Sequence, residues 1–234
     1  MKLTPEQIDR LYQFTRQHYV EWYDLQTELV DHLANAIEQQ CEENPKISFE
    51  EVLHMEFKKF GIFGFMEVVE QRQVSLNKRY NKIIWKHFKA FFTIPKIITT
   101  FSAVGIFFYM LLSLSKQAGI LINSFLIVAI LFFWFATIFK RIKYKKIAKV
   151  SGKKWFFKEV IFGYSQFAGL SYIPIQILLH VDFDSQIGTI KALFFSILIV
   201  SMYLIDYIVL FEIPSKAEDY LKETYPEYAL ENAN

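Results

Sequence analysis

A run of uncharged residues fills positions 119–139 and reads GILINSFLIVAILFFWFATIF. A helix rises about 1.5 Å per residue, so about 20 apolar residues cross the roughly 30 Å of hydrocarbon in a bilayer. Three more windows meet this requirement, at residues 97–114, 161–179 and 192–211. Lipid offers no hydrogen-bond partner to an open strand edge, so each window is predicted to be a helix. The pattern predicts an all-α protein in which residues 97–211 form a bundle of four transmembrane helices.

A basic segment follows that first run directly and sets the predicted orientation. Residues 140–154 hold eight Lys or Arg and no acid. By contrast, the link 115–118 holds one Lys, and the link 180–186 holds no Lys or Arg. Short basic loops stay in the cytoplasm. The prediction is a multi-pass protein with both termini in the cytoplasm. The high Phe, Ile and Lys content indicates a bacterial source, for which the inner membrane is the expected location.

The same basic segment supplies the candidates for contact with anionic lipid headgroups. A Lys or Arg beside an anionic leaflet contributes about 1 kcal/mol of attraction. The candidates are Lys140, Arg141, Lys143, Lys145 and Lys146. Topology alone accounts for such charges, so membrane lipids are expected partners by proximity rather than through a dedicated site.

Few polar side chains interrupt the four windows. Gln166 and Gln176 lie in the third window and need hydrogen-bond partners within the bundle. Asp206 is the one charged residue of the fourth window and lies toward its cytoplasmic end, where water would reach it. These three residues are the candidates for a transport pathway, although helix packing and an interfacial structural role explain them more simply.

The first 76 residues have a different composition, with 14 Asp or Glu against 7 Lys or Arg. Thr4 with Gln7 and Ser48 with Glu51 match the capping-box pattern that begins a helix. Helices are expected from residue 5, over residues 21–42 and 49–60, and from residue 65 toward Pro95. Residues 1–76 are therefore predicted to be an acidic cytoplasmic helical domain, residues 77–96 a basic juxtamembrane helix, and residues 212–234 an acidic cytoplasmic tail.

Charge argues against nucleic acid as a partner of this domain. DNA affinity depends largely on neutralising phosphates, whereas residues 1–76 carry a net charge of −7. An acidic bundle is better suited to a basic protein surface.

Glu28, Asp31 and His32 share one side of the second predicted helix. Their spacing is one that a metal site would use, but neither a His-Glu-x-x-His pattern nor a neighbouring Cys ligand accompanies them. A structural hydrogen bond is the simpler interpretation, so no metal and no cofactor is predicted. The windows also lack a nucleophile with a base at one depth, so no catalytic residue is predicted and the chain is expected not to be an enzyme.

The string Glu28-Leu29-Val30-Asp31-His32-Leu33, with Asn44-Pro45, Ser48-Phe49-Glu50-Glu51 and Phe60-Gly61, resembles the HAAS-type helical domain of bacterial membrane proteins. The resemblance covers residues 5–72 and departs from the family in lacking Leu-Gly-x-Pro near the end of the domain. It implies signalling or regulation beside a transcription regulator or another membrane protein. Glu28, Asp31, His32, Phe60 and Gly61 are then the candidate partner-binding residues.

Two functions follow from these patterns. The first is a membrane-anchored regulatory or scaffolding protein that acts through contacts of its cytoplasmic domain, with oligomerisation through the spans left open. The alternative is a small transporter or permease subunit that uses the polar groups of the third and fourth windows.

Overall fold

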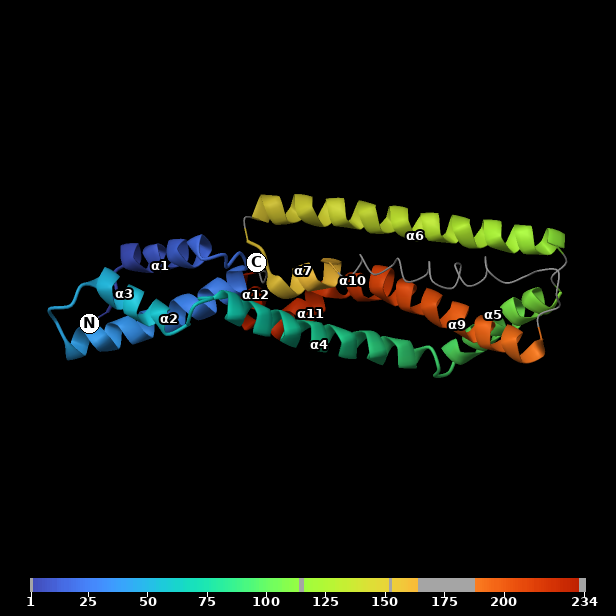
Figure 1. Ribbon diagram of the computed structural model, residues 1–234, viewed down its shortest axis with the longest axis horizontal. Coiled ribbons are helices and arrows are strands. Elements are labelled where there is room, and N and C mark those ends of the chain that lie inside the picture. Colours follow the sequence, from blue (N-terminus) through green and yellow to red (C-terminus); the bar gives the residue numbers. More distant parts are fainter. Residues whose placement is uncertain (1, 114–115, 152, 164–187, 232–234) are drawn as a thin grey trace. The chain divides into compact units, whose positions relative to one another are not determined.

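The computed structural model describes residues 2–113, 116–151, 153–163 and 188–231, and within these ranges it contains helices and no strand (Figure 1). The predicted all-α fold is confirmed for this part of the chain. The chain forms two compact units. Unit 1 comprises residues 1–78 and 148–159, and unit 2 comprises residues 79–147 and 160–234.

Unit 1 is built from helices whose starts the sequence predicted. Its helices are α1 (Pro5–Gln17), α2 (Tyr23–Glu43), α3 (Phe49–Lys58) and the first half of α4 (Met66–Ala90). Both capping boxes form: Thr4 Oγ1 accepts from the Gln7 N–H at 3.3 Å, and Ser48 Oγ accepts from the Glu51 N–H at 3.3 Å. Each cap satisfies backbone donors that the first helical turn leaves without a partner.

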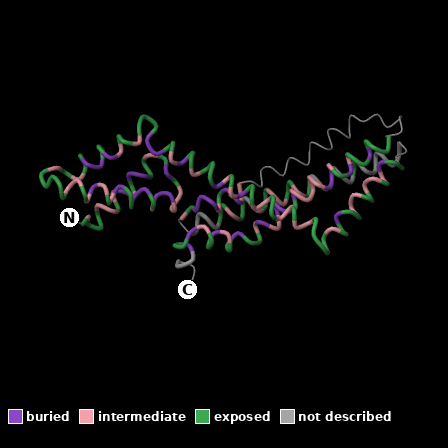
Figure 2. Tube along the Cα trace, turned by 90° about the horizontal axis from the view of Figure 1, so that it is seen from below, coloured by how far each residue is buried: buried purple, intermediate pink, exposed green. Residues whose placement is uncertain are grey.

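The core of unit 1 gathers the apolar side chains that recur at helical spacing along α2. Helices α1 and α3 both pack against α2. Figure 2 marks the buried positions along each helix. The fully or nearly fully buried apolar residues of these elements are Leu11, Phe14, Leu25, Leu29, Val30, Leu33, Ile37, Val52, Leu53 and Phe65.

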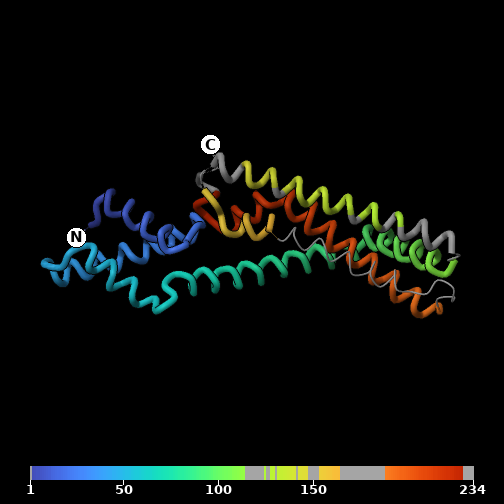
Figure 3. The backbone as a smooth tube through the Cα atoms, turned by 45° about the horizontal axis from the view of Figure 1, so that its top comes forward, coloured from blue at the N-terminus to red at the C-terminus, as the bar shows by residue number. Residues whose placement is uncertain are grey.

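Unit 2 contains the second half of α4, α5 (Lys96–Leu112), most of α6 (Lys116–Ser151), α9 (Thr189–Tyr207), a π-helix at Ile208–Glu212, α10 (Ile213–Ser215), α11 (Ala217–Thr224) and α12 (Pro226–Glu231). Helices α5 and α9 lie side by side, as Figures 1 and 3 both show. The small side chain of Ala192 lets Leu111 and Ile199 meet in a buried cluster, against which Phe107 and Tyr203 pack. One further helix, α7 (Phe156–Gly163), begins in unit 1 and ends in unit 2.

The four predicted membrane windows are described to different extents. The first corresponds closely to α5, the second lies inside α6, and the fourth covers most of α9 and the π-helix. The third window lies outside the described residues after Gly163. Among the described residues, one continuous helix, Thr189–Ser215, is long and apolar enough to cross a membrane. Core helices of soluble proteins share that property, so the multi-pass arrangement stays a prediction.

The C-terminal segment, expected to be a tail, is mostly helical up to Glu231, with α11 and α12 separated at Tyr225. Ala217 and Leu221 lie four residues apart on one face of α11 and are buried, and Tyr225 and Tyr228 beyond it are buried as well. The acidic composition of the segment hides this short apolar pattern.

Candidate functional site

The link between α3 and α4 presents two large apolar side chains to solvent. Gly64 N donates to Gly61 O at 3.3 Å, which closes a tight turn with Ile62 and Phe63 at its two central positions. Ile62 is 99% exposed and Phe63 is 76% exposed. We call Ile62 and Phe63 the apolar tip of unit 1.

A cluster of aromatic rings supports this turn from below. Phe65 is 1% exposed, and its ring centroid lies 4.9 Å from that of Phe57 and 6.2 Å from that of Phe14. Gly61 and Gly64 have positive φ angles of 77° and 53°, which side chains rarely adopt. A Cβ on Gly64 would lie 2.7 Å from the Phe57 ring, so a larger residue here would displace that ring or the backbone. The turn therefore favours glycine at both positions, and Ile62 and Phe63 at its tip are exposed.

The candidate partner-binding residues of α2 lie near this turn. The His32 ring meets the Phe60 ring edge-on at 6.1 Å between centroids, and Phe60 directly precedes Gly61. Glu28 forms an ion pair with Arg72 of α4, and Asp31 accepts from Asn35 Nδ2 at 3.4 Å. Glu28, Asp31 and His32 are all exposed. The structure thus brings His32, Phe60 and Gly61 together beside the apolar tip, while Glu28 and Asp31 are engaged in local polar contacts.

Within the described ranges, no group of three or more His, Cys, Asp or Glu side chains is placed to hold a metal ion. Glu56 of α3 is 4% exposed and receives a hydrogen bond from Lys59 Nζ at 2.6 Å and another from Gln40. Its carboxylate therefore joins α2 to the end of α3.

A second feature of unit 1 was not predicted: residues 153–159, which begin at the end of the basic segment, bind the N-terminal end of α2. The Trp22 and Phe156 rings stack at 3.9 Å with an interplanar angle of 8°. Trp22 Nε1 donates to Glu159 Oε2 at 2.6 Å. Phe156 and Phe157 are 1% and 0% exposed. We call residues 153–159 the latch segment.

Backbone hydrogen bonds also hold the latch segment against the start of α2. Tyr23 N donates to Lys154 O at 2.7 Å, and Phe156 N donates to Asp24 Oδ1 at 3.0 Å. Asp24 thus caps the start of α7 from another helix, which supplies an acceptor to an otherwise open helix end. Lys154 Nζ also bonds Glu21 Oε2 at 2.6 Å, which raises the pKa of Lys154. The sequence signal was the paired aromatics Trp22-Tyr23 and Trp155-Phe156, which periodicity alone does not connect.

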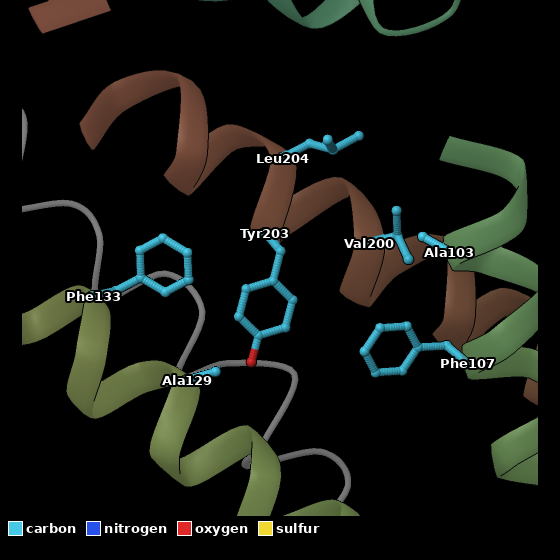
Figure 4. Close-up of a pocket in the computed structure, with 7 residues that line it drawn as sticks. All are labelled: Ala103, Phe107, Ala129, Phe133, Val200, Tyr203 and Leu204. Carbon is cyan, nitrogen blue, oxygen red and sulfur yellow. The ribbon is translucent and has the colours of Figure 1, made fainter. Parts of the chain in front are cut away.

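Unit 2 contains an apolar cavity of about 300 Å³ between α5, α6 and α9 (Figure 4). It is lined by Ala103, Phe107, Ala129, Phe133, Val200, Tyr203 and Leu204. Figure 4 shows the Tyr203 side chain reaching from α9 toward Ala129, between Phe133 and Phe107. The buried Tyr203 hydroxyl has no hydrogen-bond partner among the described residues. Among the described lining residues, the Tyr203 hydroxyl is the one polar side-chain group, so these residues do not form a catalytic or ion-binding arrangement.

The remaining predicted residues are placed as follows. Asp206, which the sequence places within reach of water or Lys158, is 2% exposed and is therefore buried in the structure. Lys140 donates to Leu210 O and lies 4.4 Å from the centre of the Phe211 ring. Pro214, four residues after Leu210, has no N–H to give to that carbonyl, so Lys140 supplies the donor.

Lys143, Lys145 and Lys146 are exposed on α6, and Arg141 belongs to the same helix. Gln166 and Gln176 lie outside the described residues.

Comparison of the chain with protein-family models, with curated proteins and with solved structures finds no match in any of the three. The functional argument therefore depends on the geometry of the chain itself.

Proposed function

We propose that this chain is a membrane-anchored regulatory or scaffolding protein of the bacterial inner membrane, and that the apolar tip of unit 1 binds a protein partner. The observation that carries the proposal is the exposure of Ile62 and Phe63 on a turn that is followed directly by the buried Phe65. Large exposed apolar side chains are typical centres of protein interfaces.

The surroundings of the tip define the chemistry of this partner. Helix α2 carries six acidic residues and no Lys or Arg, and residues 1–76 have a net charge of −7. A partner with an apolar pocket and a basic rim would complement this surface. A transcription regulator or another membrane protein, the partner classes implied by the resemblance to HAAS-type domains, is the proposed occupant.

The membrane anchor is proposed from the outward faces of the helices in unit 2. Large apolar side chains are exposed along α5, α6 and α9, including Ile98 and Tyr109, Phe135 and Phe139, and Ile190 and Phe194. Exposed contiguous apolar surface of this extent is unfavourable in water and favourable in lipid. Four spans with both termini in the cytoplasm remain the proposed topology.

A reporter fused after Asn234 tests this topology. Alkaline phosphatase is active only outside the cytoplasm, whereas green fluorescent protein folds in the cytoplasm. We expect the green fluorescent fusion at Asn234 to be bright and the phosphatase fusion to be inactive, because an even number of spans returns the chain to its starting side. Matched fusions at Asp184, between the third and fourth windows, should give the opposite pair of results. An active phosphatase at Asn234 would contradict the proposal.

Contact at the tip is proposed to reach the membrane part through the latch segment. The tip and the latch segment both belong to unit 1, and residues 148–159 of unit 1, which include the latch segment, are flanked in the sequence by residues of unit 2. A partner that favours one state of unit 1 would therefore act on the connection between the second and third predicted spans. This gives the regulatory function a physical route that requires no catalytic residue.

The double substitution Ile62→Ser with Phe63→Ser tests partner binding. Loss of two central apolar contacts is expected to cost about 2 kcal/mol or more, which is roughly a 30-fold loss of affinity. The full-length variants are cross-linked in cells, solubilised in mild detergent and purified, and the recovery of co-purified proteins is compared by quantitative mass spectrometry. The matched control is Met55→Ser with Val74→Ser, because these two side chains are 49% and 45% exposed elsewhere in unit 1. A partner that is recovered equally with both variants would contradict the proposal.

A small transporter or permease subunit is the second candidate function. The observation that favours it is the burial of Asp206 in α9, since an ionisable group buried in a span commonly marks a pathway. If no protein depends on the apolar tip for co-purification, this candidate becomes the better one.

A further inference from the structure

His87, near the end of α4, lies at the centre of a polar cluster in unit 2. Its Nε2 is 2.7 Å from the Tyr220 hydroxyl oxygen, and its Nδ1 is 3.5 Å from Glu212 Oε1. Lys216 Nζ donates to the same Glu212 oxygen at 2.8 Å. The His87 side chain is 11% exposed. One imidazole therefore connects α4 to the π-helix and to α11.

We propose that His87 is an acid-sensitive contact that holds the C-terminal helix α11 against α4 when neutral and releases it when protonated. The geometry fits the neutral ring: with the proton on Nδ1 directed at Glu212, Nε2 is free to accept the Tyr220 O–H. Protonation turns Nε2 into a donor. The Tyr220 hydroxyl must then turn its own proton away from the ring within a partly buried site, and the charged ring is buried there as well, so the docked state becomes less favourable.

The charges around His87 favour the neutral ring. The groups that face it are Glu212 on the π-helix, Lys216 at the end of α10, Tyr220 on α11, Lys86 on α4 and Lys96 on α5. Burial is the main cause that lowers the pKa of His87, and Lys216 adds to it, whereas Glu212 opposes it. The Glu212 carboxylate is already bound to Lys216, whose hydrogen bond lowers the pKa of Glu212. A proton on His87 thus adds a third positive charge beside Lys216 and Lys96.

The direction of the pH effect follows from this pKa. His87 has an ordinary pKa of 6.5 and a lower one when α11 is docked, so the released state binds the proton more readily. Docking is fully stable above that ordinary value and weakens as the pH falls below it. Arg79 and Glu223 form a second ion pair between the same two helices at 3.9 Å, which is too long and too exposed to hold them together alone.

Release of α11 would uncover apolar surface. Ala217 and Leu221 are 3% and 0% exposed in the docked state, and Tyr225 is 6% exposed. An acid-triggered helix of this kind would offer one apolar face only when the surrounding pH falls. The inference concerns unit 2 alone and is independent of the apolar tip.

A distance measurement between two spin labels tests the proposal on the full chain in lipid nanodiscs. The labels are placed at Lys82→Cys and Lys222→Cys, both exposed positions, after Cys41→Ser removes the native thiol. We expect a single narrow distance at about pH 7.5 and a broad, longer distribution at about pH 5, with reversal when the pH is restored. An unchanged distribution across this range would overturn the proposal.

Two variants separate His87 from other titrating groups. His87→Gln keeps a neutral amide in place of the ring and should keep the narrow distance at both pH values. The matched control His54→Gln, at an exposed histidine of unit 1, should preserve the full pH response. A pH response that survives in His87→Gln would overturn the proposal.

Lys216→Met keeps the test decisive if His87→Gln does not fold. Lys216 lowers the pKa of His87 and also occupies Glu212, so its removal should raise the pKa of His87 in the docked state and move the midpoint of release to a lower pH. A midpoint that stays in place or moves to a higher pH would contradict the assignment to His87.

Discussion

Replacing Phe65 with alanine is expected to lower the free energy of unfolding of unit 1 by about 3–5 kcal/mol. Phe65 is 1% exposed and contacts the rings of Phe14, His18, Phe57 and Phe60, with centroid distances from 4.8 to 6.2 Å. Alanine would remove burial of a whole ring and leave a cavity among four others, which cannot close without moving α1 and α3. Few other side chains of unit 1 join as many elements.

Native-state hydrogen exchange of the full chain in detergent measures this loss, because the slowest amides of α2 report the free energy of opening of unit 1. Phe63→Ala is the matched control, since the same ring is removed two residues away. Phe63 is 76% exposed, so its loss should change the opening free energy by less than about 0.5 kcal/mol. Equal effects of the two substitutions would show that the aromatic cluster does not support the turn.

The helices of unit 1 could be predicted because their signals are local. Thr4 with Gln7 and Ser48 with Glu51 each place a cap beside the turn that it satisfies. The positive φ angles of Gly61 and Gly64 agree with the break expected between the third and fourth helices. Exposure of Ile62 and Phe63 could not be predicted, because it depends on which rings occupy the space beneath the turn.

The features that the sequence did not reveal are contacts between distant segments. The Trp22–Phe156 stack joins residues 134 positions apart, and no periodic pattern encodes such a pair. The same applies to His87 and Tyr220, whose separation in sequence is 133 residues. The basic composition of residues 140–154 predicts the side of the membrane on which the segment lies. It does not indicate that Lys140 binds Leu210 O or that Lys154 binds Glu21. Charge patterns predict the side of a membrane, whereas the partners of individual charges depend on tertiary structure.

Replacing Trp22 with alanine is expected to release the latch segment. The substitution removes the stack on Phe156 and the hydrogen bond to Glu159 Oε2, which together should stabilise docking by about 2–4 kcal/mol. Exchange of the Phe156 N–H, which Asp24 protects, should then accelerate roughly 30-fold or more. The Tyr23 N–H should accelerate in parallel, because it donates to Lys154 O.

Trp85→Ala is the matched control for Trp22→Ala, because it removes the same side chain from a position outside the latch contacts. Trp85 is 57% exposed on α4 and stacks only on a neighbour three residues along the same helix, Phe88, at 5.4 Å. Trp85→Ala should therefore leave exchange at Phe156 and Tyr23 within about twofold of the parent chain. If the latch segment carries regulation, Trp22→Ala should also leave partner binding at the apolar tip intact while removing its effect on the membrane part. Unchanged exchange at Phe156 in Trp22→Ala would mean that backbone and charge contacts hold the latch segment without the aromatic stack.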